Sequence, residues 1–158
     1  MSKTDLPILE QRRIEANIVK PIYEEMAAEL GTERAKSILE AAIVKNAIAH
    51  GKAYAEAQAE TTSLMSFHAL LPQWMDDGAL EVEILTENDK NVDYNVTRCR
   101  FAEMYREMGI GDIGHILSCG RDGTFCTGYD PKIHLDRSQT IMQGASHCDF
   151  RYRYESDN

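Results

Sequence analysis

Residues 80–99 read LEVEILTENDKNVDYNVTRC and mark the point where helical patterning gives way to strands. Apolar residues alternate with glutamates before a polar stretch, and alternation returns after it, as in two half-buried strands joined by a turn. The apolar positions are Leu80, Val82 and Ile84 in the first strand, and Val92, Tyr94 and Val96 in the second. The stretch therefore predicts an antiparallel pair of strands.

The residues before this pair have the period of helices. A first helix is predicted from about Pro7 to Leu30, with Asp5 as its cap. Pro21 lies inside this helix and should kink or split it. Large apolar residues recur every four positions and predict one buried face: Ile18, Ile22, Met26 and Leu30.

Gly31 and Thr32 predict a stop and a restart, so a second helix is expected over about 33–60. A third helix is expected after Ser63. After the strand pair, we expect helices near 101–108 and 112–119, and a hairpin that runs from 133–141 through a turn at Gly144 to 147–154.

Helices followed by antiparallel strands predict the α+β class, with an N-terminal helical layer packed on a small, mainly antiparallel sheet. A chain of 158 residues fits one domain, 1–158. Its first part, 1–77, is expected to be mainly helical. Its second part, 78–158, is expected to be the α+β half that carries the site.

The net charge of −9 disfavours nucleic acid and anionic membranes as partners. The first 13 residues lack the apolar segment of a signal peptide, so a cytoplasmic location is expected. The four cysteines are then expected as free thiols or ligands and not as disulfides. A small-molecule substrate is the expected partner, and self-association into a homo-oligomer stays open.

Reactive side chains gather between residues 99 and 149. His115 and Cys119 are four positions apart on a predicted helix, so an imidazole could raise the thiolate fraction of the cysteine. The alternative is a buried structural cysteine with a surface histidine nearby. His147 and Cys148 are neighbours on a predicted strand and should point to opposite faces, so His147 is not expected to serve Cys148.

A zinc site built from Cys99, Cys119, Cys148 and a histidine is a competing hypothesis. No CxxC or HxxxH spacing supports it, so neither a metal nor another cofactor is expected. Arg137 could hold a substrate carboxylate through two parallel hydrogen bonds. An ion pair with Asp136, Asp122 or Asp149 is the alternative.

No P-loop, GxSxG or HExxH motif is present. The second half instead carries six short motifs: VTRC (96–99), AEMYREMG (102–109), SCGRD (118–122), GYDP (128–131), DRSQTIMQG (136–144) and HCDFRY (147–152). Together they resemble the L-2-amino-thiazoline-4-carboxylic acid hydrolase family. The resemblance centres on Cys99, Cys119, Asp122, Arg137, Thr140, Gly144, Cys148 and Asp149, and does not require His115.

The resemblance implies a hydrolase that opens a small carboxylated heterocycle at a cyclic C–N or C–S bond. Water would add to the amidine-like ring carbon, the ring sulfur would leave, and an N-carbamoyl amino acid would form. The attack would use a cysteine thiolate or a water activated by Asp122. The expected catalytic residues are Cys119, Asp122, Cys148 and His115, and the expected substrate-binding residues are Cys99, Arg137, Thr140, His147 and Asp149. A non-catalytic sensor of a small ligand or metal is the alternative function.

Overall fold

The computed structural model describes residues 6–156, so the predicted cap Asp5 lies outside the described residues. The α-helices of this part are α1 (Ile8–Leu30), α2 (Thr32–Glu56), α3 (Leu64–His68), α4 (Leu71–Trp74), α5 (Arg100–Glu107) and α6 (Arg121–Tyr129). The strands are β1 (Leu80–Glu87), β2 (Asn91–Cys99), β3 (Ile133–Asp136) and β4 (Cys148–Tyr154). Single turns occur as 3₁₀-helix at Asp76–Gly78 and Ile141–Gln143, and as π-helix at His115–Cys119.

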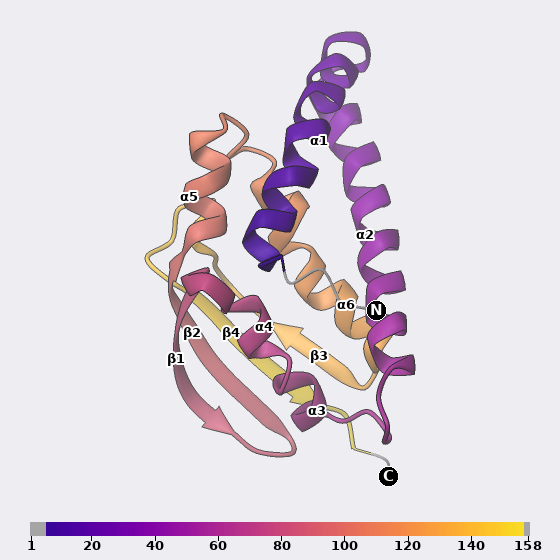
Figure 1. Cartoon of the computed structure of the whole chain (residues 1–158), viewed down its shortest axis with the longest axis vertical. Coiled ribbons are helices and arrows are strands. Elements are labelled where there is room, and N and C mark those ends of the chain that lie inside the picture. Colours follow the sequence, from indigo (N-terminus) through magenta and orange to yellow (C-terminus); the bar gives the residue numbers. More distant parts are fainter. Residues whose placement is uncertain (1–5, 157–158) are drawn as a thin grey trace.

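The four strands form one antiparallel sheet in the order β1-β2-β4-β3 (Figure 1). The predicted α+β class, with N-terminal helices packed against a small antiparallel sheet, is therefore confirmed. In this sheet Val96 lies opposite Cys148, and Leu80 lies opposite Cys99. The register thus brings two of the cysteines to the same end of β2.

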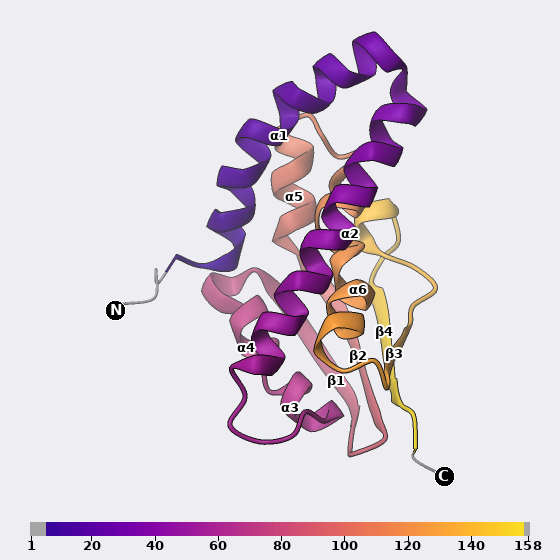
Figure 2. The same cartoon turned by 90° about the vertical axis from the view of Figure 1, so that its right-hand side faces the viewer.

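The long helices α1 and α2 form an antiparallel hairpin that extends beyond the sheet, and α6 lies between α2 and the strands (Figures 1 and 2). The contact between α2 and α6 depends on two glycines. A Cβ atom on Gly51 would lie 2.8 Å from the Tyr129 nitrogen, and one on Gly128 would lie 2.9 Å from the Ile48 carbonyl carbon. Side chains at these positions would hold the two helices apart.

The predicted buried face of the first helix is wrong for most of its members. Ile18, Ile22 and Leu30 are 61%, 51% and 52% exposed. α1 instead packs through Leu9, Ala16 and Tyr23, because only this narrow face meets α2 and α5 where the hairpin extends past the rest of the protein. The helix also runs without a break through Pro21, so the predicted split does not occur.

Several other boundaries differ from the sequence predictions. The second helix ends at Glu56, and the segment after Ser63 forms two short helices rather than one. Of the helix predicted over 112–119, His115–Cys119 form a π-helical turn, and α6, which follows it, was not predicted. The strand expected over 133–141 ends at Asp136 because the backbone N–H groups of 138 and 139 donate to a side chain and not to the sheet.

The core consists of two hydrophobic clusters. One lies among α1, α2, α5 and the π-helical turn, and the other lies between the sheet and α3, α4 and α6. Leu80, Cys99 and Ile141 contact both clusters. None of the helices within residues 6–156 has the length and hydropathy needed to cross a membrane.

Candidate functional site

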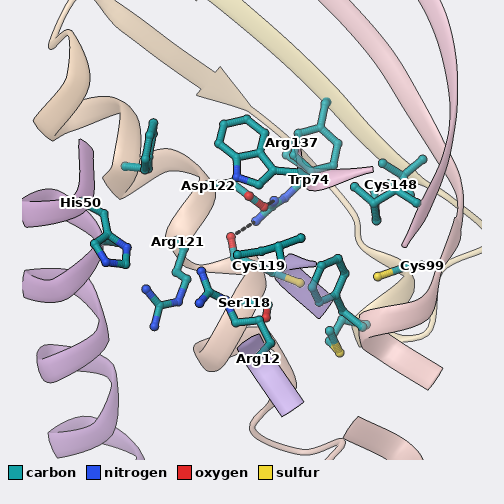
Figure 3. A pocket seen from close by; sticks show the side chains of 18 of the residues that line it. Arg12, His50, Trp74, Cys99, Ser118, Cys119, Arg121, Asp122, Arg137 and Cys148 are labelled. Atoms are coloured by element: carbon teal, nitrogen blue, oxygen red, sulfur yellow. Dashed lines mark hydrogen bonds and ion pairs between the residues drawn. The ribbon is translucent and has the colours of Figure 1, made fainter. Parts of the chain in front are cut away.

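A cavity of about 270 Å³ opens where the two core clusters meet (Figure 3). This volume suits a small ligand, since sites for drug-sized molecules begin at roughly 300 Å³. Its lining combines aromatic rings, thiols and a few charged groups from both halves of the chain. The lining includes Arg12, His50, Tyr54, Phe67, Trp74, Cys99, Cys119, Arg121, Asp122, Phe125, Arg137, Cys148 and Phe150.

Three of the four cysteines line this cavity, and all four are free thiols. Cys99 ends β2, Cys148 begins β4, and Cys119 ends the π-helical turn, so the sheet register and this turn bring the thiols together. Burial raises the pKa of Cys99 to about 11 and also raises the pKa values of Cys119 and Cys148. At neutral pH the three groups are therefore neutral S–H groups and not thiolates.

An ion pair joins Asp122 and Arg137 at the cavity wall. One guanidinium nitrogen donates to the Asp122 carboxylate at 2.7 Å, and another donates to the carbonyl oxygen of Cys119 at 3.1 Å. The guanidinium carbon also lies 5.1 Å from the centre of the Phe150 ring. Arg137 is thus occupied by groups of the protein, which corresponds to the ion-pair alternative weighed from the sequence.

Asp122 keeps its carboxylate accessible to the cavity. Its side chain is 36% exposed, against 11% for Arg137. Burial raises the pKa of Asp122, although the charge of Arg137 and its hydrogen bond act in the opposite direction. Asp122 is also the only carboxylate among the described residues that line the cavity. A raised pKa makes this carboxylate a stronger base than an ordinary aspartate.

Asp149 positions Arg137 from outside the cavity. Its carboxylate accepts hydrogen bonds from the backbone N–H groups of Ser138 and Gln139 and from the Ser138 hydroxyl. Desolvation works against ionisation here, but these hydrogen bonds lower the pKa of Asp149. The carboxylate therefore fixes the segment that directly follows Arg137.

The remaining predicted site residues lie away from the cavity lining. Thr140 is buried and caps the 3₁₀ turn by accepting from the Gln143 N–H at 3.2 Å. His147 contacts Ser146 and Gln139. His115 has its Nδ1 atom buried without a hydrogen-bond partner among the described residues. Burial and the charge of Arg137 lower its pKa, and no interaction between its ring and the Cys119 thiol occurs in the described part of the chain.

The sequence analysis missed the contribution of the N-terminal helices to the cavity. Arg12 comes from α1, whereas His50 and Tyr54 come from α2. Four aromatic side chains form a wall in which successive ring centres are 5.4–5.7 Å apart: Tyr54, Phe125, Trp74 and Phe67. One residue of the sequence could have indicated this contribution. Gly51 of α2 has no side chain, which permits α6 to approach α2 closely.

No group of three or more histidine, cysteine, aspartate or glutamate side chains within residues 6–156 is arranged to hold a metal ion. The three thiols line the cavity, and no histidine or carboxylate in the described part of the chain joins them in such a group. Among the charged groups that line the cavity, Arg137 and Asp122 pair with each other.

The fold has a counterpart among solved structures. The phenol-responsive sensory domain of the transcription activator PoxR, in its crystal structure with phenol, superposes with a TM-score of 0.55 at 14% identity. The match covers 87% of this chain and 73% of that chain, and it shows a shared fold. No curated protein matches the chain significantly.

The family is established by the sequence as a whole. Residues 11–152 match the family model described as L-2-amino-thiazoline-4-carboxylic acid hydrolase, and the chain belongs to this family. The resemblance read from the six motifs is thereby confirmed. Family membership indicates a ring-opening hydrolase.

Proposed function

We propose that the cavity binds a small carboxylated heterocycle of the 2-amino-thiazoline-4-carboxylate type and hydrolyses it with a water activated by Asp122. The observation that carries this proposal is the Asp122 carboxylate, which is accessible to the cavity, has a raised pKa and is held in place by Arg137. General bases work best when their pKa lies near the working pH, so a raised carboxylate pKa favours this role.

The thiols support the water route over the thiolate route. Burial raises the pKa values of Cys119 and Cys148, so little of the nucleophilic form exists near neutral pH. Neutral thiols still contribute, because they provide a polarisable wall with weak S–H donors for a sulfur-containing ring.

The proposed reaction balances as the addition of one water molecule. Asp122 takes a proton from the water as its oxygen bonds to the amidine-like ring carbon. The tetrahedral adduct then collapses to a C=O group, the bond from that carbon to the ring sulfur breaks, and the sulfur leaves with its electron pair. The proton held by Asp122 passes to the leaving sulfur, and the second water proton moves to the ring nitrogen. The product is an N-carbamoyl amino acid with a free thiol.

A non-catalytic sensor is the second candidate function. The aromatic wall and the neutral thiols form a largely apolar chamber, which would hold a small ring without reacting with it. The shared fold with a phenol-responsive sensory domain adds support for this alternative. Turnover separates the two candidates, because a sensor would bind the heterocycle and leave it intact.

The test is hydrolysis of L-2-amino-thiazoline-4-carboxylate, followed as new low-molecular-weight thiol after the protein has been removed. We expect turnover in the wild-type protein and a loss of about 10²–10⁴-fold in Asp122→Asn. Asp136→Asn is the matched control, since this exposed carboxylate lies at the end of β3 outside the cavity lining. Binding that stabilises the protein without any release of thiol would contradict the hydrolase and favour the sensor.

A further inference from the structure

Two arginines from distant parts of the chain meet at the cavity. Figure 3 shows Arg12 and Arg121 approaching each other from different helices, α1 and α6. Arg12 donates to both carboxylate oxygens of Glu15, at 2.5 and 3.1 Å. Arg121 donates to the Leu117 carbonyl at 2.8 Å and to the Asn46 side chain at 2.9 Å, and neither of these partners carries a charge.

The charges around the cavity do not cancel. Arg12 and Arg137 each have a carboxylate partner, in Glu15 and Asp122, whereas Arg121 has none among the described residues. One positive charge is therefore left in excess in a largely apolar space. Burial and then the charge of Arg12 lower the pKa of Arg121, while the more weakly acting charges of Glu15 and Asp122 raise it. The two carboxylates therefore do not offset burial and the repulsion between the two guanidinium groups.

His50 lies on the same side of the cavity and responds to the same field (Figure 3). Burial and then the charges of Arg121 and Arg12 lower its pKa, so the imidazole is neutral and does not add to the excess. A single anion between the two arginines would cancel the excess charge. Arginine is also the side chain best suited to this task, because its planar N–H groups match a carboxylate in two parallel hydrogen bonds.

We propose that Arg12 and Arg121 form a carboxylate subsite that selects small monoanionic ring compounds and orients their rings toward Asp122 and the thiols. The identity of the ring rests on the proposed function, whereas the selection for a carboxylate rests on the arginines alone. Arg137, the residue predicted from the sequence for this role, already donates to Asp122 and to the Cys119 carbonyl. The subsite thus lies between α1 and α6, and not at Arg137 in the segment between β3 and β4.

The experiment compares two ligands of closely similar shape, of which one carries a carboxylate and the other an uncharged carboxamide. L-thiazolidine-4-carboxylate has a five-membered ring without the amidine carbon, and its carboxamide has the same shape without the negative charge. Calorimetric titration of wild type, Arg121→Gln, Arg12→Gln and Arg13→Gln gives the affinity ratio of the two ligands. Arg13 is the control, since it follows Arg12 on α1 and pairs with Glu10 outside the cavity lining.

We expect wild type to prefer the carboxylate, and each cavity variant to lose about tenfold or more of that preference. Affinity for the carboxamide should stay within a few-fold, and Arg13→Gln should match wild type. Arg12→Gln tests the inference independently if loss of the Leu117 and Asn46 contacts unfolds Arg121→Gln. Equal losses for both ligands, or an unchanged preference in both cavity variants, would overturn the subsite.

The subsite and the proposed function fail in different ways. A carboxylate preference that depends on both arginines, without hydrolysis of 2-amino-thiazoline-4-carboxylate, supports the subsite and contradicts the hydrolase. Hydrolysis whose KM is unchanged by Arg12→Gln and Arg121→Gln contradicts the subsite and leaves the hydrolase standing.

Discussion

Gly128→Ala should separate α6 from α2 and thereby disturb the cavity. The added Cβ would lie 2.9 Å from the Ile48 carbonyl carbon and closer still to its oxygen, and these are backbone atoms that cannot rotate away. Overpacking of this kind costs about 1–3 kcal/mol. For a chain of this length, that cost corresponds to a fall in Tm of roughly 2–12 °C. Because α2 carries His50 and α6 carries Asp122, ligand affinity should fall as well.

Gly123→Ala is the matched control for this prediction. Gly123 lies in the same helix, and a Cβ atom there would meet nothing within 4 Å. Replacing an unhindered helical glycine by alanine stabilises a protein by roughly 0.5–1 kcal/mol. Thermal unfolding of both variants should therefore show shifts of opposite sign. A Gly128→Ala protein as stable as Gly123→Ala would refute the close helix contact that shapes this side of the cavity.

Two further predictions concern a thiol and a carboxylate. Cys119→Ser should keep most of its turnover per folded molecule but lose about 1 kcal/mol of stability, since a hydroxyl replaces a half-buried thiol. Denaturation and turnover measured on the same sample check this. The lowered pKa of Asp149 stabilises the fold at pH values above the unfolded-state value near 3.9, and this contribution is lost as the pH falls through the lower folded-state pKa. The stability difference between wild type and Asp149→Asn should therefore be constant near neutral pH and shrink in acid, as urea unfolding at several pH values would show; a pH-independent difference would contradict it.

The strands of the sheet could be predicted because the pattern that marks a strand lies within a few consecutive residues. Alternation along β1 and β2 identifies both strands, and in β2 it also identifies the buried side chains. In β1 the alternation fails at Ile84, which is 43% exposed, because β1 is an edge strand whose register with β2 shifts on both sides of Val82–Ile84. The concentration of cysteines, Asp122 and Arg137 in the second half also indicated which segments would meet. Antiparallel pairing then brings Cys148 beside Val96, and the residues that follow β3 return Arg137 to Asp122.

Features set by long-range packing could not be predicted in this way. The period of α1 identifies apolar positions, but it does not say which of them another element will cover, and Ile18 and Ile22 remain exposed. The α6 sequence, RDGTFCTGY, contains two glycines and two threonines, which are poor helix formers. Its packing against α2 stabilises the helix, and the same packing brings Arg121 near Arg12.

The pH dependence of kcat for hydrolysis of L-2-amino-thiazoline-4-carboxylate tests most directly whether Asp122 is the base. A carboxylate base must be ionised, and burial raises the pKa of Asp122. We therefore expect kcat to fall in acid with an apparent pKa above the ordinary aspartate value near 3.9, and to stay constant from there through pH 9. Asp122→Asn should lose this pH dependence together with most of the rate. A rate that instead climbs about tenfold per pH unit to pH 9 and beyond, and that disappears in Cys119→Ser or Cys148→Ser, would contradict the account and assign the attack to a thiolate.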